Sequence, residues 1–156
     1  MAIIVTPPNE SYTVESISEN RKLFLAGGIS HCADWQSIVI AHLSGFSRLT
    51  IYNPRRVDYG KEKEMEQICW EFKQLEKADI IAFWFAKETA CPISLYELGK
   101  WGNSSTKPIV IGVDPEYTRK SDVIIQTSLA RPDVDIWTDF GSFVRAVEGT
   151  VASRRK

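Results

Sequence analysis

Short apolar runs alternate with helical segments along nearly the whole chain, and this alternation limits the folds open to it. Five runs have the length and apolar character of strands, at residues 22–26, 49–52, 79–85, 108–113 and 135–137. Four segments have helical spacing of apolar residues, at 34–45, 61–77, 94–102 and 140–151. Because crossovers between parallel strands are right-handed, we predict an α/β fold with a doubly wound, five-stranded parallel sheet in the order 2-1-3-4-5.

Three of these segments carry more detailed expectations. Asp34 precedes the first helix, and its carboxylate can cap the free N–H groups at that helix start. The run 79–85 is continuous and apolar, so we expect it to be a central strand covered on both faces. In the segment 61–77 the side chains expected to face inward are Met65, Ile68, Cys69, Phe72 and Leu75.

The chain of 156 residues has the size of one domain, 1–156, with 1–21 as an N-terminal extension and 152–156 as a basic tail. Its composition of 44% hydrophobic and 25% charged residues excludes wholesale disorder. The polar stretch 7–21 is expected to be a surface connection. The apolar run 2–5 stops at two prolines, which makes it too short for a signal peptide or a membrane span.

Charge and cysteine content exclude several kinds of partner. The net charge of −1 gives no general field that would attract polyanions, so we expect no nucleic-acid partner. Cys32, Cys69 and Cys91 are odd in number and widely spaced, without a nearby pair of histidines, and indicate neither a disulfide framework nor a zinc site. We therefore expect a soluble, cytoplasmic protein with no bound metal and no membrane partner.

Doubly wound sheets bind ligands beyond the carboxyl ends of their strands, where the strand order reverses. Gly27 and Gly28 follow the first predicted strand and should lie at that point. The pair lacks the third glycine of the dinucleotide fingerprint, so we do not expect NAD. Two roles remain open for it, which are the close approach of a ligand to bare backbone and a tight turn.

The second predicted strand ends in a polar group at the same edge. Asn53, Arg55 and Arg56 can clamp a phosphate, a carboxylate or an acidic neighbour there. A solvated turn is the alternative. The sequence leaves both interpretations open.

Two glutamates have positions suited to catalysis. Glu97 falls in the first turns of a short helix that starts at the edge of the sheet where a ligand is expected to bind. As a carboxylate there, it can attack a sugar C1. It should be ionised at neutral pH unless its pocket strongly desolvates it. Glu71, on the helix before the third strand, can exchange a proton with a base. A glutamate stabilised by a helix N-terminus and a solvated helix face are the corresponding structural alternatives. No Ser or Cys elbow accompanies His31 or His42, so a histidine-activated nucleophile is not expected.

Several short motifs in order, and their spacing, resemble the nucleoside 2-deoxyribosyltransferase-like family from about residue 23 to 147. They are 24–28, 34–36, 53–56, 70–71, 78–79, 83–85 and 92–99. The resemblance implies a flavodoxin-like fold and transfer of 2-deoxyribose between bases by double displacement, with no cofactor and no metal. It also implies a homodimer or higher homo-oligomer with shared active sites, acting on a nucleoside or nucleotide and a free base.

The resemblance assigns roles to single residues as well. Glu97 stands in the family's Glu-Leu-Gly motif as the nucleophile, and Glu71 stands eight residues before Asp79 as the base-contacting acid. Ser121 and Asp122 fall near the position whose side chain crosses to a neighbouring subunit and holds the 5′ side of the sugar. The predicted substrate-binding residues are Gly27, Gly28, Asp34, Trp35, Asn53, Arg55, Arg56, Ser94, Ser121 and Asp122. An N-glycoside hydrolase and a non-catalytic nucleotide-binding module are the alternative functions.

Overall fold

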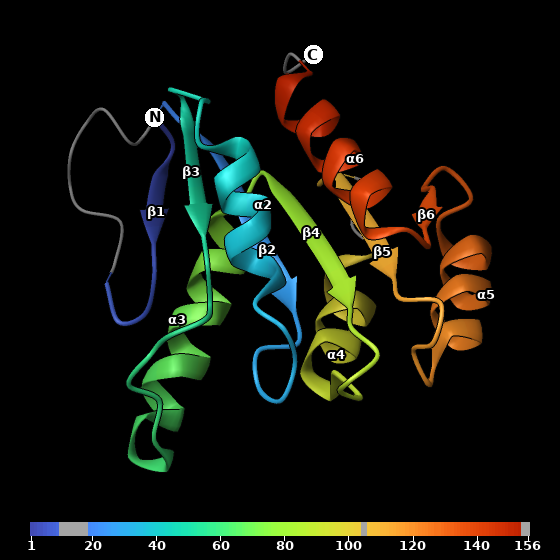
Figure 1. Cartoon of the computed structure of the whole chain (residues 1–156), viewed down its shortest axis with the longest axis horizontal. Helices are drawn as coiled ribbons and strands as arrows, with labels where there is room; N and C mark the ends of the chain where they lie inside the picture. Colours follow the sequence, from blue (N-terminus) through green and yellow to red (C-terminus); the bar gives the residue numbers. More distant parts are fainter. Residues whose placement is uncertain (10–18, 104–105, 154–156) are drawn as a thin grey trace.

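The structure is a computed structural model that describes residues 1–9, 19–103 and 106–153. Its centre is one all-parallel sheet, and Figure 1 labels the strands from one edge of the sheet to the other. The strands within the described residues are β1 (Ile3–Val5), β2 (Arg21–Gly27), β3 (Leu49–Tyr52), β4 (Ile80–Phe85), β5 (Ile109–Val113) and β6 (Ile136–Trp137). Their order in the sheet is β1-β3-β2-β4-β5-β6.

The predicted strand count and order were wrong by one edge strand. The five predicted strands keep the order 2-1-3-4-5, but β1 adds a sixth beside β3, where Ile3 is the register partner of Thr50. Part of the predicted extension 1–21 therefore belongs to the sheet. Of the three residues in β1 only Val5 is buried, because an edge strand has a neighbour on one side alone.

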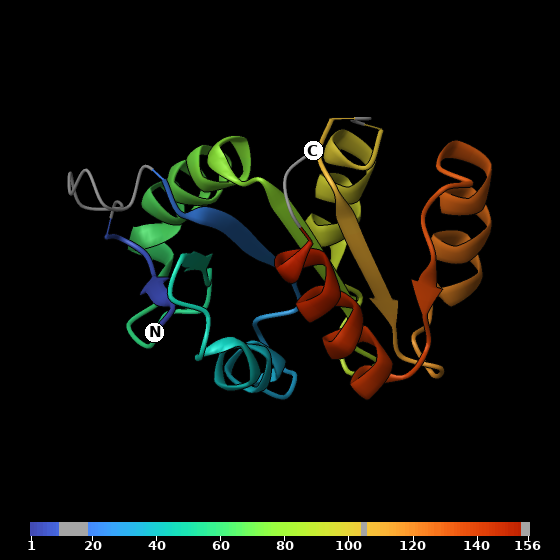
Figure 2. The same cartoon turned by 90° about the horizontal axis from the view of Figure 1, so that it is seen from above.

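Helices cover both faces of the sheet. Figure 2 shows α3, α4 and α5 on one face and α2 and α6 on the other. Their bounds are α2 (Trp35–Leu43), α3 (Glu64–Lys77, after the short 3-10 turn Lys61–Lys63), α4 (Pro92–Trp101), α5 (Lys120–Ala130) and α6 (Phe140–Ala152). None of these helices is long and apolar enough to span a bilayer, over the part of the chain that the structure describes. This arrangement is an α/β fold consistent with the flavodoxin-like type.

The capping prediction is confirmed, while α5 was missed. Asp34 is the N-cap of α2, and its carboxylate accepts a hydrogen bond from Ser37 N at 3.1 Å. The helix α5 buries only Val123 and Thr127 among its eleven residues. A helix with so narrow an apolar stripe gives a weak periodic signal in the sequence.

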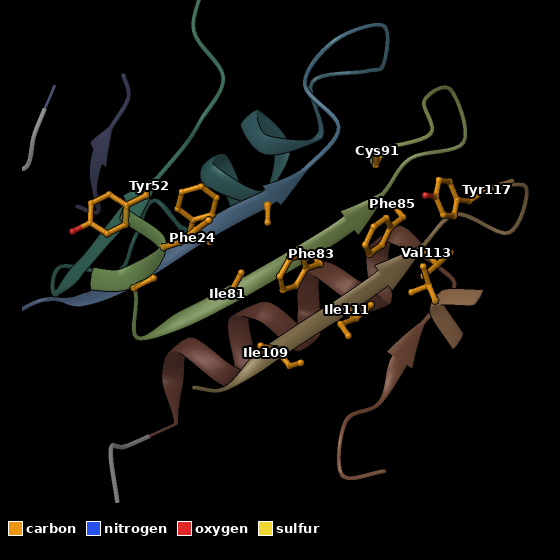
Figure 3. Packing of buried hydrophobic residues seen from close by; sticks show 14 of the residues in the cluster. Phe24, Tyr52, Ile81, Phe83, Phe85, Cys91, Ile109, Ile111, Val113 and Tyr117 are labelled. Atoms are coloured by element: carbon orange, nitrogen blue, oxygen red, sulfur yellow. The ribbon is translucent and has the colours of Figure 1, made fainter. Parts of the chain in front are cut away.

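The core has two layers, one on each side of the sheet, and β4 belongs to both. Every residue of β4 is buried, as predicted for the central strand. Because successive side chains of a strand point to opposite faces, Ile81, Phe83 and Phe85 face α3 and α4, whereas Ala82 and Trp84 face α2 and α6. Figure 3 shows the first layer, in which the rings of Phe83 and Phe85 stack with centroids 6.4 Å apart.

The predicted inward face of α3 was largely wrong. Met65, Ile68, Cys69 and Phe72 are exposed, and of the predicted set only Leu75 is buried. The side chains of α3 that are buried are Gln67, Trp70, Gln74 and Leu75. The helix therefore turns two glutamines toward the interior and leaves an apolar stripe on the surface.

Candidate active site

Two acidic side chains lie between α3 and α4, above the same face of the sheet. Glu71 comes from the second half of α3, and Glu97 comes from the second turn of α4. The two helices are neighbours, since Lys100 Nζ of α4 lies 4.1 Å from the ring centroid of Phe72 of α3. Glu97 is only 8% exposed, and Glu71 is partly buried. Acidic side chains in proteins are rarely removed from solvent, so two of them together with little access to solvent are unusual.

Burial changes the protonation of both carboxyl groups. It raises the pKa of Glu97 to about 8, and the charge of Glu71 raises that pKa further as the second cause. Burial also raises the pKa of Glu71, while a hydrogen bond from Gln67 lowers it. We expected Glu97 to be ionised at neutral pH unless its pocket strongly desolvates it, and this exception applies, because desolvation is the largest cause of the pKa shift. At neutral pH the pair retains a proton, so it can both attack an electrophile and supply an acid.

The start of α4, the helix that carries Glu97, lies against the end of β2. Cys91 precedes the helix in the left-handed conformation, with φ of 47°, and Pro92 occupies its first turn. Ser94, one turn before Glu97, is 4% exposed. A Cβ on Gly28 would lie 3.3 Å from Cys91 Sγ, which places the helix start directly beside the β2 end.

The glycine pair after β2 is approached closely by the protein itself. A Cβ on Gly27 would lie 2.4 Å from Trp84 O and 2.6 Å from Trp35 Cζ2. The carbonyl of Gly28 accepts hydrogen bonds from Trp35 Nε1 at 3.1 Å and from Gln36 Nε2 at 3.2 Å. Trp35, predicted to bind substrate, is thus a core residue that orders this turn.

The two arginines after β3 contact acidic neighbours, one of the alternatives left open by the sequence. Arg55 Nε lies 3.2 Å from Asp34 Oδ1, and Arg55 Nη2 donates to Ala33 O at 3.2 Å. Asn53 Oδ1 accepts a hydrogen bond from the backbone N–H of Arg55 at 3.1 Å. These contacts join the end of β3 to the loop that precedes α2.

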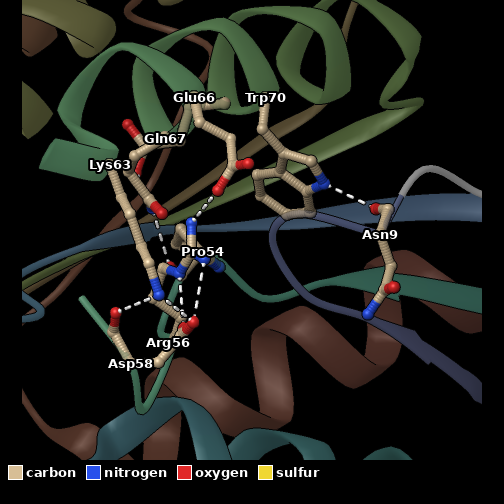
Figure 4. A network of polar contacts seen from close by, with 9 residues as sticks. Asn9, Pro54, Arg56, Asp58, Lys63, Glu66, Gln67 and Trp70 are labelled. Carbon is tan, nitrogen blue, oxygen red and sulfur yellow. Dashed lines mark hydrogen bonds and ion pairs between the residues drawn. The ribbon is translucent and has the colours of Figure 1, made fainter. Parts of the chain in front are cut away.

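Arg56 ties the same segment to α3. Its guanidinium lies 2.8 Å from Asp58 Oδ1 and 2.7 Å from Glu66 Oε1, as Figure 4 shows. Lys63 also pairs with Asp58. The Arg56 side chain is 4% exposed, so these carboxylates neutralise a nearly buried charge.

Sequence reasoning missed Gln67, which lies one helical turn before Glu71. Its Nε2 donates to Glu71 Oε1 at 2.7 Å and to Pro54 O at 2.8 Å. The i, i+4 spacing of Gln67 and Glu71 was the available signal, because side chains so spaced are neighbours on a helix.

Ser121 and Asp122 lie apart from the acidic pair, on α5. Ser121 is exposed, and Asp122 pairs with Arg119 at 2.9 Å. Asp122 lines a pocket of about 340 Å³ between α4 and α5, together with Leu95, Leu98 and Val123. Neither Glu71 nor Glu97 lines this pocket. Its lining mixes aliphatic with polar residues, and its one acid is already paired with an arginine, so the acidic pair is the better candidate for chemistry.

The helices above the acidic pair also expose large apolar side chains. We call this set the α3–α4 apolar surface, and its members are Met65, Ile68, Phe72, Ile93 and Tyr96. Three come from α3 at helical spacing and two from α4, and each is between 47% and 75% exposed.

No cluster of three or more His, Cys, Asp or Glu side chains placed to hold a metal ion occurs among the described residues.

Comparison with known proteins gives one family. A sequence model described as nucleoside 2-deoxyribosyltransferase like matches residues 20–117, more than half of the chain. The matched range contains both Glu71 and Glu97 and the ends of β2, β3 and β4, and it ends before Ser121. No protein among those with curated functions matches the chain.

Proposed function

Because the chain belongs to the nucleoside 2-deoxyribosyltransferase-like family, we propose that it cleaves the N-glycosidic bond of a 2′-deoxynucleoside and transfers the deoxyribose to another base. The observation that carries this proposal is the pair of Glu71 and Glu97 between α3 and α4, where burial, and after it the charge of Glu71, raises the pKa of Glu97. A chain that served only to bind a nucleotide would gain nothing from burying two acids together.

The reaction divides into two displacements at C1′ of the sugar. In the first, a carboxylate oxygen of Glu97 attacks C1′, and the C1′–N bond breaks with its electron pair going to the base. Glu71 gives its proton to a ring nitrogen of the departing base. In the second, a ring nitrogen of the incoming base attacks C1′ and releases Glu97, while Glu71 takes the proton that this nitrogen loses.

The proton content of the pair suits this sequence of steps. The first displacement needs Glu97 ionised and Glu71 protonated, which requires one proton for the two carboxyl groups. Burial keeps a proton in the pair at neutral pH. Positive charge develops at C1′ as the glycosidic bond breaks and favours the ionised form of Glu97, so the proton is expected to reside on Glu71 in the transition state.

The substrate is proposed to be an unphosphorylated nucleoside. The two arginines next to the β3 end are each held by carboxylates, Arg55 by Asp34 and Arg56 by both Asp58 and Glu66. A 5′-phosphate would have to displace these partners before either guanidinium could bind it. Neutral sugar hydroxyls require no such exchange.

The active form is proposed to be a homo-oligomer built on the α3–α4 apolar surface, with a second copy of the chain as its occupant. Contiguous apolar patches of this kind are rare on monomeric proteins and mark interaction sites. Met65, Ile68 and Phe72 form a stripe on α3, and Phe72 contacts Lys100 of α4, so the two helices present one continuous face. That face lies on the helices that carry Glu71 and Glu97, so a second copy would cover the acidic pair.

The function is tested by incubation of the protein with 2′-deoxyadenosine, with and without free cytosine, followed by chromatography. We expect 2′-deoxycytidine only when cytosine is present. Free deoxyribose as the sole sugar product would identify a hydrolase, and the absence of any cleavage would contradict the proposal. Glu97→Gln should abolish product formation, and the matched control Glu64→Gln, at an exposed glutamate of α3, should not.

A further inference from the structure

Gln67 is a nearly buried amide that is wedged between a backbone carbonyl and the acid of the proposed site. Its Nε2 donates to both Pro54 O and Glu71 Oε1, at 2.8 and 2.7 Å. We propose that Gln67 is a positioning residue that confines the exchangeable proton of Glu71 to Oε2. This inference rests on the proposed function, since it concerns how Glu71 delivers a proton to a base.

The orientation of the Gln67 amide is determined by Pro54. A carbonyl oxygen only accepts hydrogen bonds, so the amide nitrogen must face Pro54 O. The reversed amide would bring Gln67 Oε1 to that carbonyl, with two acceptors in contact and no proton between them. Because the same nitrogen reaches Glu71 Oε1, the backbone fixes which group the carboxyl receives.

The chain segment that contains Pro54 is fixed to α3 by ion pairs. Arg56, two residues later, is paired with Glu66 of α3 and with Asp58, as Figure 4 shows. Pro54 is buried at the end of β3. The carbonyl that orients Gln67 is therefore attached to the sheet on one side and to α3 on the other.

An N–H donated to Oε1 decides where Glu71 carries its proton. The carbonyl oxygen of a carboxylic acid is a better acceptor than its hydroxyl oxygen, so the hydroxyl is placed on Oε2. The same bond lowers the pKa that burial raises, so the protonated form of Glu71 is a stronger acid toward the base. Glu97 of α4 is the ionisable group whose charge interacts with that of Glu71. Gln67 thus gives a directional acid whose proton leaves and returns at one oxygen.

Packing alone does not account for a glutamine at this position. Gln67 is 7% exposed, and its Oε1 is buried without a hydrogen-bond partner among the described residues. A buried unpaired carbonyl oxygen is unfavourable by about 1–3 kcal/mol. Methionine has nearly the same length and would avoid that penalty, so the function of the amide lies in the two bonds that its nitrogen makes.

The test measures two substrates with the 156-residue chain that carries Gln67→Met. The base of 2′-deoxyadenosine needs a proton to depart, whereas the cationic base of 7-methyl-2′-deoxyguanosine departs without one. A correctly placed acid accelerates such reactions by about 10²–10⁴. We expect kcat for 2′-deoxyadenosine to fall by about 10–100-fold and kcat for the methylated substrate to change by less than about threefold, as part of that acceleration is lost.

Gln74→Met is the matched control, because Gln74 is a fully buried glutamine of the same helix whose side-chain nitrogen and oxygen find no hydrogen-bond partner within the part of the chain that the structure describes. It should leave the ratio of the two kcat values unchanged. Glu71→Gln should give the same substrate pattern as Gln67→Met, and the double variant should be no slower than Glu71→Gln alone.

Each other outcome overturns a defined part of the account. An equal fall on both substrates, or no change on either, would contradict the positioning role while the proposed function stands. A wild-type protein that cleaves neither substrate would contradict the proposed function and this inference with it. If Gln67→Met does not fold, Gln67→Asn withdraws the amide from Glu71 by one methylene and gives the same comparison.

Discussion

Replacement of Glu97 by glutamine is expected to stabilise the protein while it removes the nucleophile. Glutamine has the shape of the neutral acid, so it fills the same space between α3 and α4 without a charge that must be desolvated. In the folded protein burial raises the pKa of Glu97 to about 8, from an unperturbed value of 4.5. Folding therefore favours the protonated form, and the stability of the wild type falls as the pH rises between these two values.

The magnitude follows from the pKa difference. Each pKa unit is worth about 1.4 kcal/mol, so the loss approaches about 5 kcal/mol above pH 8. At pH 7 most folded molecules still carry the proton on Glu97, and the loss is about 3 kcal/mol. Below pH 5 it is under about 1 kcal/mol. Glu97→Gln escapes this loss, so its advantage over the wild type should grow with pH.

Urea denaturation at pH 5, 7 and 8.5 measures this difference, with protein concentration held constant because association also stabilises the folded state. The free energy of unfolding of Glu97→Gln should exceed that of the wild type by an amount that increases across the series. Glu64→Gln, at an exposed position of α3, should show no such increase. A difference that is the same at pH 5 and pH 8.5 would refute the desolvation of Glu97.

Three further predictions concern the turn, the arginines and the apolar surface. Gly27→Ala should lower the free energy of unfolding by about 1–3 kcal/mol, because its Cβ would lie 2.4 Å from the backbone oxygen of Trp84. Gly149→Ala, with open space around it in α6, should raise the free energy of unfolding by up to about 1 kcal/mol. Thermal melts measure both variants. Tolerance of both changes would mean that the turn can yield. Arg56→Met should lower activity by loosening the segment between β3 and α3, yet leave the ratio of kcat/KM for 2′-deoxyadenosine and its 5′-monophosphate unchanged; loss of a preference for the monophosphate would show that Arg56 binds phosphate. Ile68→Lys should convert the wild-type oligomer to monomers in sedimentation, whereas Ile125→Lys, equally exposed on α5, should not; a wild-type monomer at assay concentration would remove the proposed interface.

The order of the strands was accessible from the sequence because four of the five apolar runs, those of β2, β3, β4 and β5, have buried centres, whereas the short run of β6 is only partly buried. The continuous stretch of β4 identified the central strand, and Asp34 marked a helix start. The edge strand β1 was not accessible, since three residues with one buried side chain carry no periodic pattern. The helix α5 was missed for a related reason, as it buries only two of its residues.

The orientation of α3 shows a limit of periodicity. The helix has apolar residues on two faces, and the pattern does not reveal which of them packs on the sheet. Trp70 and Leu75 pack there together with Gln67 and Gln74, while Met65 and Phe72 remain outside. Buried polar residues such as Gln67 are expected at a functional site, and exposed apolar residues such as Phe72 are expected at an interface. A rule that places every apolar residue inside assigns both kinds of residue to the wrong side of the helix.

The candidate site was accessible in outline. The sequence predicted Glu71 on the helix before the third strand and Glu97 on the helix after it, and the structure shows that these two helices, α3 and α4, are neighbours. The raised pKa of Glu97 depends on burial by residues distant in the chain, so the sequence does not reveal it. The contacts of Gln67 with Pro54 and Glu71 likewise depend on how the β3 end meets α3.

The most direct test of the account is the detection of the sugar on Glu97. The protein is incubated with a 2′-fluoro nucleoside, whose fluorine slows both displacements, and is then quenched, digested and analysed by mass spectrometry. The account predicts the mass of the fluorinated sugar on the peptide that contains Glu97, and no such adduct in Glu97→Gln. An adduct on a different residue, or turnover of the substrate by Glu97→Gln at the wild-type rate, would contradict the assignment of the nucleophile and the double displacement together.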